Sequence, residues 1–172
     1  MGGSGKTVIT VAIARDAEVR ASFDLICFVG VGQAPDLHEL QRQLYYQATK
    51  TMLNAKLTTE WEVREALRGA VKGRNVLILV DDAWSTKHVD AFDCIDPNTD
   101  SRLIVSSRLQ GLVLGAPEFS LGVLEPTDAV ALIYEVAGVN IVPPYDPLAY
   151  KVAEACSHLP LVLSVAGGML VQ

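Results

Sequence analysis

The chain has 172 residues, of which 50% are apolar and 20% are charged, a composition typical of a soluble globular protein with one sizeable core. Its formal net charge of −6 argues against nucleic acid and anionic membrane surfaces as partners. The longest strongly apolar stretch, residues 159–171, is too short to span a bilayer and is predicted to be a core helix. Cys27, Cys94 and Cys156 lack metal-binding spacing and are predicted to be buried free thiols, which suits a cytoplasmic location.

The chain begins MGGSGKT, in which Lys6 and Thr7 complete a phosphate-binding loop motif whose leading glycine would precede Met1. Such a loop closes successive backbone N–H groups on phosphate oxygens, next to the positive end of the following helix. Lys6 is expected to reach the β- and γ-phosphates and Thr7 to ligate Mg²⁺. The backbone of the loop would come from Gly2, Gly3, Ser4 and Gly5. The alternative is a glycine-rich start with a chance match to the motif.

Three helices and one strand are predicted between this loop and residue 73. A helix directly after the loop is predicted from the apolar stripe Ile9, Ala12, Ile13 and Ala17. Residues 25–31 form a short apolar run that predicts a buried strand. The next helix begins behind Asp36 as its N-cap and carries Leu37, Leu40, Leu44, Ala48 and Met52. The third is bounded by a capping box of Thr59 and Glu62 and by Gly73.

Two carboxylates follow the next predicted strand, residues 76–80. Asp81 and Asp82 end a fully apolar run, which is costly unless a cation or water receives them. In phosphate-loop NTPases the first acid holds Mg²⁺, and an adjacent acid can orient or deprotonate the attacking water. We therefore expect Asp81 in the first role and Asp82 in the second. The alternative is a strand that simply leaves the core through a polar turn.

Residues 102–106 predict another buried strand, which ends in two hydroxyls and Arg108. The carboxyl ends of parallel strands meet at one edge of a sheet, so Arg108 should lie on the same edge as Asp81 and Asp82. There it could stabilise a γ-phosphate, although an ordinary surface ion pair explains an arginine equally well. A fourth strand is predicted at residues 119–124, and the alternation of strands with helices predicts a parallel α/β sheet.

After residue 124 the pattern changes to three helices, the last of which opens at Pro160. Their predicted stripes are Ala129, Leu132, Ile133, Val136 and Ala137; Leu148, Val152, Ala155, Cys156 and Leu159; and Val162, Val165, Ala166, Met169 and Leu170. We expect a nucleotide-binding domain at residues 1–124 and a helical subdomain at 125–172. From chemistry alone Pro160 is a structural start signal, Trp61 and Trp84 are core or interface aromatics, and the three histidines show no ligand-like grouping.

Five motifs, MGGSGKT, FDLICFVGVG, LILVDDAW, RLIVSSR and HLPLVLSVAGG, resemble the NB-ARC family in order and spacing. That family is the nucleotide-binding module of plant disease-resistance proteins and apoptotic adaptor ATPases, which are STAND-type P-loop NTPases. The resemblance covers nearly the whole chain. It implies a three-layer P-loop NTPase sheet followed by a small helical subdomain similar to the family's ARC1.

The resemblance also implies roles for individual residues. Gly3, Gly5, Lys6 and Thr7 are similar to the Walker A loop, and Asp81 and Asp82 to the Walker B pair. Arg108 is similar to the sensor that reads the γ-phosphate. Pro160 is similar to the proline that packs by the nucleotide, in HLPL where the family usually has GLPL, so that His158 replaces a glycine.

Further parts of the family's protein are expected beyond this chain. The family's first strand precedes the loop and lies between the strands that we predict at 76–80 and 102–106. Because the family's loop commonly reads GMGGSGKT, Met1 is expected to be an internal residue of a truncated fragment. An N-terminal effector domain and C-terminal winged-helix and repeat domains are the partners that the resemblance implies.

The resulting functional hypothesis is an ATP/ADP-binding module of a defence or cell-death signalling switch. The resemblance implies an ADP-bound resting state, an ATP-bound state that forms homo-oligomers, and slow Mg²⁺-dependent hydrolysis in the intact parent. Whether the fragment turns nucleotide over stays open. Two alternatives remain: a non-binding remnant or interaction module, and a small metabolic phosphoryl-transfer kinase, for which no basic lid segment is visible.

Overall fold

The computed structural model describes residues 2–171, which divide into two compact units. The sheet unit is Lys6–Glu118, and the helical unit joins residues 2–5 to residues 119–171. Met1, which the resemblance matches to an internal loop residue, lies outside the described residues. Among the described helices, none has the length and apolar character needed to cross a membrane.

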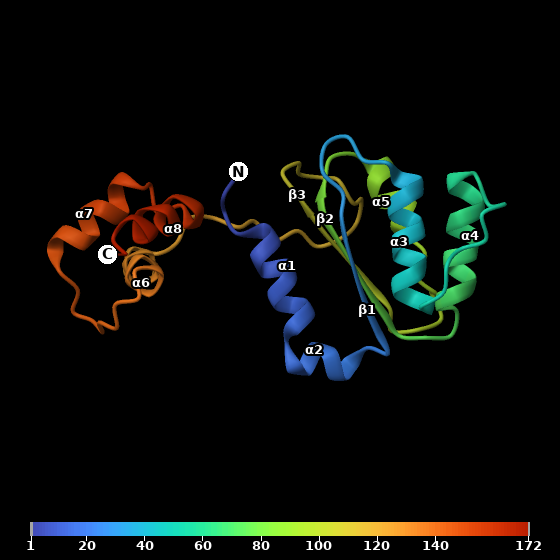
Figure 1. Cartoon of the computed structure of the whole chain (residues 1–172), viewed down its shortest axis with the longest axis horizontal. Helices are drawn as coiled ribbons and strands as arrows, with labels where there is room; N and C mark the ends of the chain where they lie inside the picture. The colour runs from blue at the N-terminus through green and yellow to red at the C-terminus, as the bar shows by residue number, and fades with distance from the viewer. Residues whose placement is uncertain (1, 172) are drawn as a thin grey trace. The chain divides into compact units, whose positions relative to one another are not determined.

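A parallel sheet of three strands forms the centre of the sheet unit (Figure 1). Its strands are β1 (Leu25–Gly30), β2 (Val76–Ala83) and β3 (Arg102–Ser107), in the order β1-β2-β3. These confirm three of the four predicted strands. The fourth prediction, at residues 119–124, is wrong: this segment forms no strand, and Phe119 and Val123 are exposed. A short apolar run does not by itself supply the neighbouring strand that a ladder needs.

The neighbours of β2 differ from those that the family resemblance implies. That resemblance places a further strand between β2 and β3, whereas in the described residues β2 pairs directly with β3, from Leu77 opposite Arg102 to Val80 opposite Val105. Unpaired backbone N–H and C=O groups on a buried strand are costly. Pairing the two strands with each other satisfies these groups.

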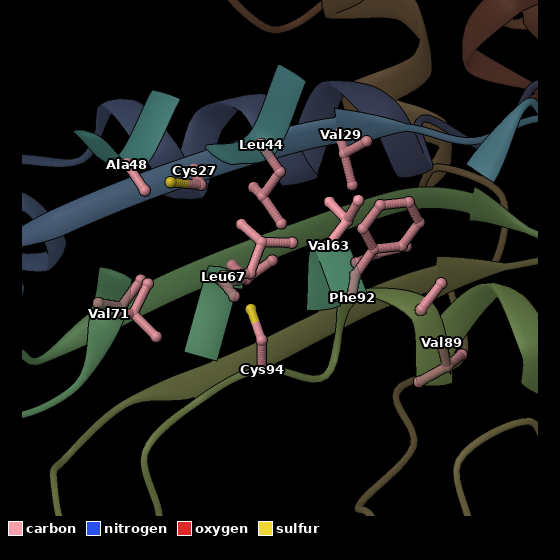
Figure 2. Packing of buried hydrophobic residues seen from close by; sticks show 14 of the residues in the cluster. Cys27, Val29, Leu44, Ala48, Val63, Leu67, Val71, Val89, Phe92 and Cys94 are labelled. Carbon is pink, nitrogen blue, oxygen red and sulfur yellow. The ribbon is translucent and has the colours of Figure 1, made fainter. Parts of the chain in front are cut away.

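Helices cover both faces of the sheet (Figure 1). On one face lie α3 (Leu37–Thr49), α4 (Glu60–Val71) and α5 (Thr86–Phe92); on the other lie α1 (Lys6–Arg15) and α2 (Ala17–Ser22). Figure 2 shows Leu44 of α3, Leu67 of α4 and Phe92 of α5 packed in the core of the first face. Leu77 and Leu79 alternate with the strand residues of that core and are equally buried, so they face the α1 layer. This is the expected three-layer α/β arrangement.

The predicted helix boundaries in the sheet unit are largely confirmed. The Asp36 carboxylate accepts from the N–H of Glu39, and Thr59 and Glu62 form a reciprocal capping box. Gly73 has a φ of 71°, the left-handed backbone expected just past a helix end. Met52 lies beyond the end of α3 and is exposed, which corrects the predicted stripe. The prediction omitted the short helices α2 and α5.

The predicted apolar stripe of α1 does not face the core. Thr10 is the buried residue of this helix, while Ile9 and Ala12 are exposed and Ala17 belongs to α2. The buried Thr10 hydroxyl is satisfied because it donates a hydrogen bond to the Lys6 carbonyl at 2.9 Å. Of the predicted stripe only Ile13 is half-buried, so most of the stripe lies away from the buried face of α1.

The helical unit contains α6 (Pro126–Val136), α7 (Pro147–Ala155) and α8 (Pro160–Met169). Each begins with proline at its first position, as the sequence predicts for α7 and α8. Asp146 caps α7 by accepting from the N–H of Leu148. The shared core is small and consists of Ala129, Val130, Ile133, Ala153 and Leu163.

The sequence assigns the buried faces of α7 and α8 incorrectly. In α7 the buried residue is Ala153, whereas Leu148 and Val152 of the predicted stripe are exposed. In α8 the buried residues are Leu163 and Gly167, whereas Val162, Val165, Met169 and Leu170 of the predicted stripe are exposed and Ala166 is half-buried. The prediction that residues 159–171 form a core helix is therefore wrong for most of its side chains. The helix carries apolar residues on all of its sides, so the periodicity of the sequence does not identify the face that is buried.

Gly167 lies so close to α6 that it determines which face of α8 packs against that helix. A Cβ at this position would lie 2.7 Å from the Ile133 carbonyl oxygen and 2.9 Å from the Val136 Cβ. Only a residue without a side chain permits this approach. Gly168, one position further along the same helix, would place a Cβ in open space.

Gly167→Ala should therefore destabilise the helical unit by about 1–3 kcal/mol through overpacking. The matched control, Gly168→Ala, should leave stability unchanged or raise it by about 0.4–1 kcal/mol because it restricts the unfolded chain. Urea unfolding followed by circular dichroism compares the two variants. Equal effects would contradict the packing that we describe.

Two of the three cysteines are buried in the core of the sheet unit, as predicted. Burial raises the pKa of Cys27 to about 11 and that of Cys94 to about 12. Cys156 is only half-buried, which corrects its predicted burial. The reactive thiolate form of the two core cysteines is thus disfavoured at neutral pH.

At about pH 8, Cys27 and Cys94 should react with DTNB far more slowly than Cys156, because a raised pKa lowers the thiolate fraction and burial excludes the reagent. Absorbance of the released thiol anion measures this reaction. In denaturant all three cysteines should react together. Rapid labelling of Cys94 in the folded chain would contradict its burial.

Candidate functional site

Asp81 near the end of β2 is the centre of a hydrogen-bonded group in the sheet unit. Asp81 is only 6% exposed, and a buried carboxylate needs polar partners to replace the water that it loses. The Thr7 hydroxyl, from the first turn of α1, donates to its Oδ2 at 2.7 Å. The Ser106 hydroxyl, from β3, donates to its Oδ1 at 2.5 Å. The side chain of Asp81 therefore ties α1 and β3 to the central strand.

These oxygens fit a divalent cation. Mg²⁺ prefers oxygen ligands and is commonly held by one or two carboxylates together with hydroxyl, phosphate or water oxygens. Asp81 and Thr7 present a carboxylate and a hydroxyl whose oxygens lie 2.7 Å apart. The two residues that the sequence assigns to metal binding are thus brought together.

Asp82 occupies an unusual backbone position. Its φ is 55°, in the left-handed region that few residues other than glycine adopt, and the register of β2 against β3 shifts between Val80 and Ala83. Its N–H donates to the Ser106 hydroxyl at 3.0 Å instead of continuing the ladder. Strained backbone of this kind is concentrated at functional sites. β2 therefore continues through both acids, three residues further than the predicted strand.

The Asp82 carboxylate has two partners in the sheet unit. The indole N–H of Trp84 donates to its Oδ2 at 3.1 Å, and Arg108 Nε lies 3.5 Å from its Oδ1. The Arg108 guanidinium also lies over the Trp84 ring, 5.3 Å from the ring centroid. The structure thus brings Arg108 to the same edge of the sheet as both acids.

The glycine loop belongs to the helical unit by its contacts and leads into α1 at Lys6. Gly3 and Gly5 have φ values of 76° and 87°, and Ser4 between them is buried. Left-handed residues that alternate with ordinary ones turn successive N–H groups toward one point, where an anion can bind. An L side chain at either position would be strained, which explains why Gly3 and Gly5 of MGGSGKT are glycines.

Within the helical unit this loop contacts the start of α8. The N–H of Leu161, next to Pro160, donates to the Gly3 carbonyl at 3.2 Å. This bond satisfies one of the N–H groups that every helix leaves unpaired in its first turn. A Cβ at Gly3 would lie 3.1 Å from the Leu161 Cβ, so the contact is close. Because Leu161 bonds to Gly3, the preceding residue Pro160 also lies near the glycine loop.

His158 stands where the resemblance places a glycine. Its φ is 53°, a left-handed conformation that glycine adopts without strain. Its carbonyl accepts from the Leu124 N–H at 3.0 Å. The backbone geometry of the motif is thus kept despite the substitution.

A parallel sheet between helix layers, with a glycine loop before the first helix and an acid pair near the end of β2, defines a P-loop NTPase fold. A family model described as "NB-ARC domain" matches residues 1–140. Because this match covers most of the chain, the chain belongs to the NB-ARC family.

Longer proteins from plants and bacteria are similar to the chain. The probable disease resistance protein At4g14610 of Arabidopsis thaliana is 29% identical, and the match covers 97% of this chain and 24% of that protein. Disease resistance protein SUMM2 of Arabidopsis thaliana is 27% identical, over 97% of this chain and 20% of its own length. Regulatory protein AfsR of Streptomyces coelicolor is 32% identical, over 99% of this chain and 17% of its own length. The chain therefore spans about a quarter or less of these relatives.

Sequence reasoning missed two residues of this site. The sequence predicts Trp84 to be a core or interface aromatic, whereas its indole donates to Asp82 and contacts Arg108. The sequence predicts Ser106 only as a hydroxyl at a strand end, whereas it contacts both acids. Their proximity in sequence to Asp82 and Arg108 was the available signal. Trp61, predicted in the same way as Trp84, is 69% exposed and is no core residue.

Ser106→Ala should destabilise the chain by about 1–3 kcal/mol, because the Asp82 N–H loses its acceptor and Oδ1 of the buried Asp81 carboxylate loses its donor, although Thr7 still bonds to Oδ2. The control is Ser22→Ala, since the Ser22 hydroxyl is exposed and donates to the Glu18 carbonyl one turn earlier in the same helix. That control should change stability by about 0.5 kcal/mol or less. Chemical unfolding measures both, and an equally small effect would refute the role of Ser106.

Proposed function

We propose that the chain binds an adenine nucleotide together with Mg²⁺, as the nucleotide-binding module of a signalling switch ATPase. The observation that carries the proposal is the contact of Thr7 with Asp81, which joins the hydroxyl after the glycine loop to the acid at the end of β2. A phosphate loop and a metal-binding acid require this proximity.

Each part of the proposed site has a chemical role. The backbone of Gly2, Gly3, Ser4 and Gly5 would bind phosphate oxygens, as supported by the left-handed glycines. Lys6, the first residue of α1, would neutralise the β- and γ-phosphates. Thr7 and Asp81 would hold Mg²⁺, which when bound neutralises phosphate charge. Pro160 would pack by the nucleotide.

Asp82 and Arg108 would act at the terminal phosphate. Asp82 would orient the attacking water, and Arg108 would sense the γ-phosphate. Their position at the carboxyl ends of adjacent parallel strands supports these roles, since ligands of open α/β sheets bind at that edge. Slow hydrolysis in the intact parent follows from the same proposal.

The signalling role rests on the family and its relatives. Two of the relatives described above are named as disease resistance proteins, and one as a regulatory protein. We propose a cytoplasmic switch in which ADP maintains a resting state and ATP permits homo-oligomerisation. Residues 1–124 would form the nucleotide-binding domain and 125–172 the ARC1-like subdomain. Effector, winged-helix and repeat domains of a longer parent would be its partners.

ADP with Mg²⁺ at about a hundred times its dissociation constant should stabilise the chain by about 2.7 kcal/mol, visible as a higher melting temperature. Lys6→Ala should abolish this stabilisation because it removes the phosphate-binding cation. Differential scanning fluorimetry measures both proteins.

The control for that experiment is Lys87→Ala, which removes an exposed lysine from α5 and should leave the shift intact. An unchanged shift in Lys6→Ala would refute the assignment of the loop. A wild-type chain that ADP and ATP both leave unstabilised would favour a non-binding interaction module.

A further inference from the structure

Trp84 lies immediately after β2 and is held in place from a neighbouring helix. Its backbone N–H donates at 3.2 Å to Nδ1 of His88, a buried residue of α5. The side chain is half-buried. Trp84 is therefore anchored at the edge of the sheet independently of the charged groups that it contacts.

The indole makes two chemically different contacts. Its N–H donates to Asp82 Oδ2 at 3.1 Å. Its ring makes a cation–π contact with the Arg108 guanidinium, whose Cζ lies 5.3 Å from the ring centroid. Arg108 Nε is in turn 3.5 Å from the other Asp82 oxygen, Oδ1. The three side chains thus form a closed set of contacts in which Trp84 touches both charges.

Arg108 is the more loosely held of the two charged groups. Asp82 is fixed by the indole N–H and by its own N–H bond to Ser106. The Arg108 side chain is 46% exposed, and its 3.5 Å approach to Asp82 is longer than the roughly 2.7–2.9 Å of a strong charge-assisted hydrogen bond. Exposed pairs of this kind are weak. An anion with more negative charge, such as a phosphate, can therefore compete with Asp82 for the Arg108 guanidinium.

We propose that Trp84 is a positioning residue that lets the chain distinguish a nucleoside triphosphate from a diphosphate. The inference rests on the function proposed above and deepens it. The indole keeps Arg108 beside Asp82, at the strand edge where a terminal phosphate would compete for it. That phosphate draws the guanidinium away from Asp82 Oδ1, while the indole N–H continues to hold Oδ2. The contact between Arg108 and the Trp84 ring changes as a result.

Trp84 itself can report this change. The chain contains two tryptophans, and Trp61 is an exposed residue of α4. Trp61→Phe leaves Trp84 as the single tryptophan, so emission excited at the red edge of absorption comes from the site. AMP-PNP and ADP, each with Mg²⁺, are the probes, and calorimetry gives their dissociation constants.

In the Trp61→Phe chain, AMP-PNP should alter Trp84 emission more than ADP does. Adding Arg108→Gln should remove the difference in emission between the two nucleotides, because it removes the guanidinium that a terminal phosphate would draw from Asp82. Trp84→Leu, made in the native background, should weaken AMP-PNP binding about fivefold, the cost of ordering one side chain that the indole otherwise pre-positions, and ADP binding much less. Trp84→Phe, which keeps a ring for Arg108 but lacks the N–H, should lie between native and Trp84→Leu.

Two results would overturn the inference alone. One is equal weakening of both nucleotides in Trp84→Leu and Trp84→Phe, which indicates a merely structural role. The other is an AMP-PNP-specific emission change that persists after Arg108→Gln. If neither nucleotide stabilises or binds the Trp61→Phe chain, the proposed function fails and the inference fails with it. Circular dichroism verifies folding, and the milder Trp84→Phe retains the test if Trp84→Leu unfolds.

Discussion

The buried carboxylate at the end of β2 is the constraint on which the sheet unit depends. Burying Asp81 is costly unless hydrogen bonds replace the water it loses, and the hydroxyls of Thr7 and Ser106 supply them. These two donors come from α1 and β3, so both elements must meet the end of β2. The same bonds orient the carboxylate, which links the stability of this edge to its proposed chemistry.

The acid that follows is arranged by a second, local departure from regular structure. The irregularity in β2 leaves Asp82 in a left-handed conformation and gives its N–H to Ser106. Ser106 therefore serves both acids at once, and Trp84 and Arg108 complete the surroundings of the second. One carboxylate is held by hydroxyls and the other by an indole and a guanidinium. Two adjacent acids thus acquire different environments, as two different proposed roles require.

Much of the fold was predictable where the signal is local. Three strands, the Asp36 cap and the Thr59–Glu62 capping box each depend on residues a few positions apart. The convergence of the acids with Arg108 was predictable from the parallel sheet alone, since strand ends share an edge. The contacts of Trp84 were not, because a tryptophan after a strand packs against whatever the tertiary structure places beside it.

The sequence by itself determined the α/β class, the starts of α3, α4, α7 and α8, and the residue types at the candidate site, because composition, periodicity and capping act within short stretches of chain. Only the tertiary structure decided which faces of α1, α7 and α8 are buried and which strand lies beside β2. Those choices depend on partners distant in sequence. Gly167 illustrates the reason. From the sequence alone a glycine is expected only to weaken a helix, whereas its contact with Ile133 determines which side of α8 packs against α6.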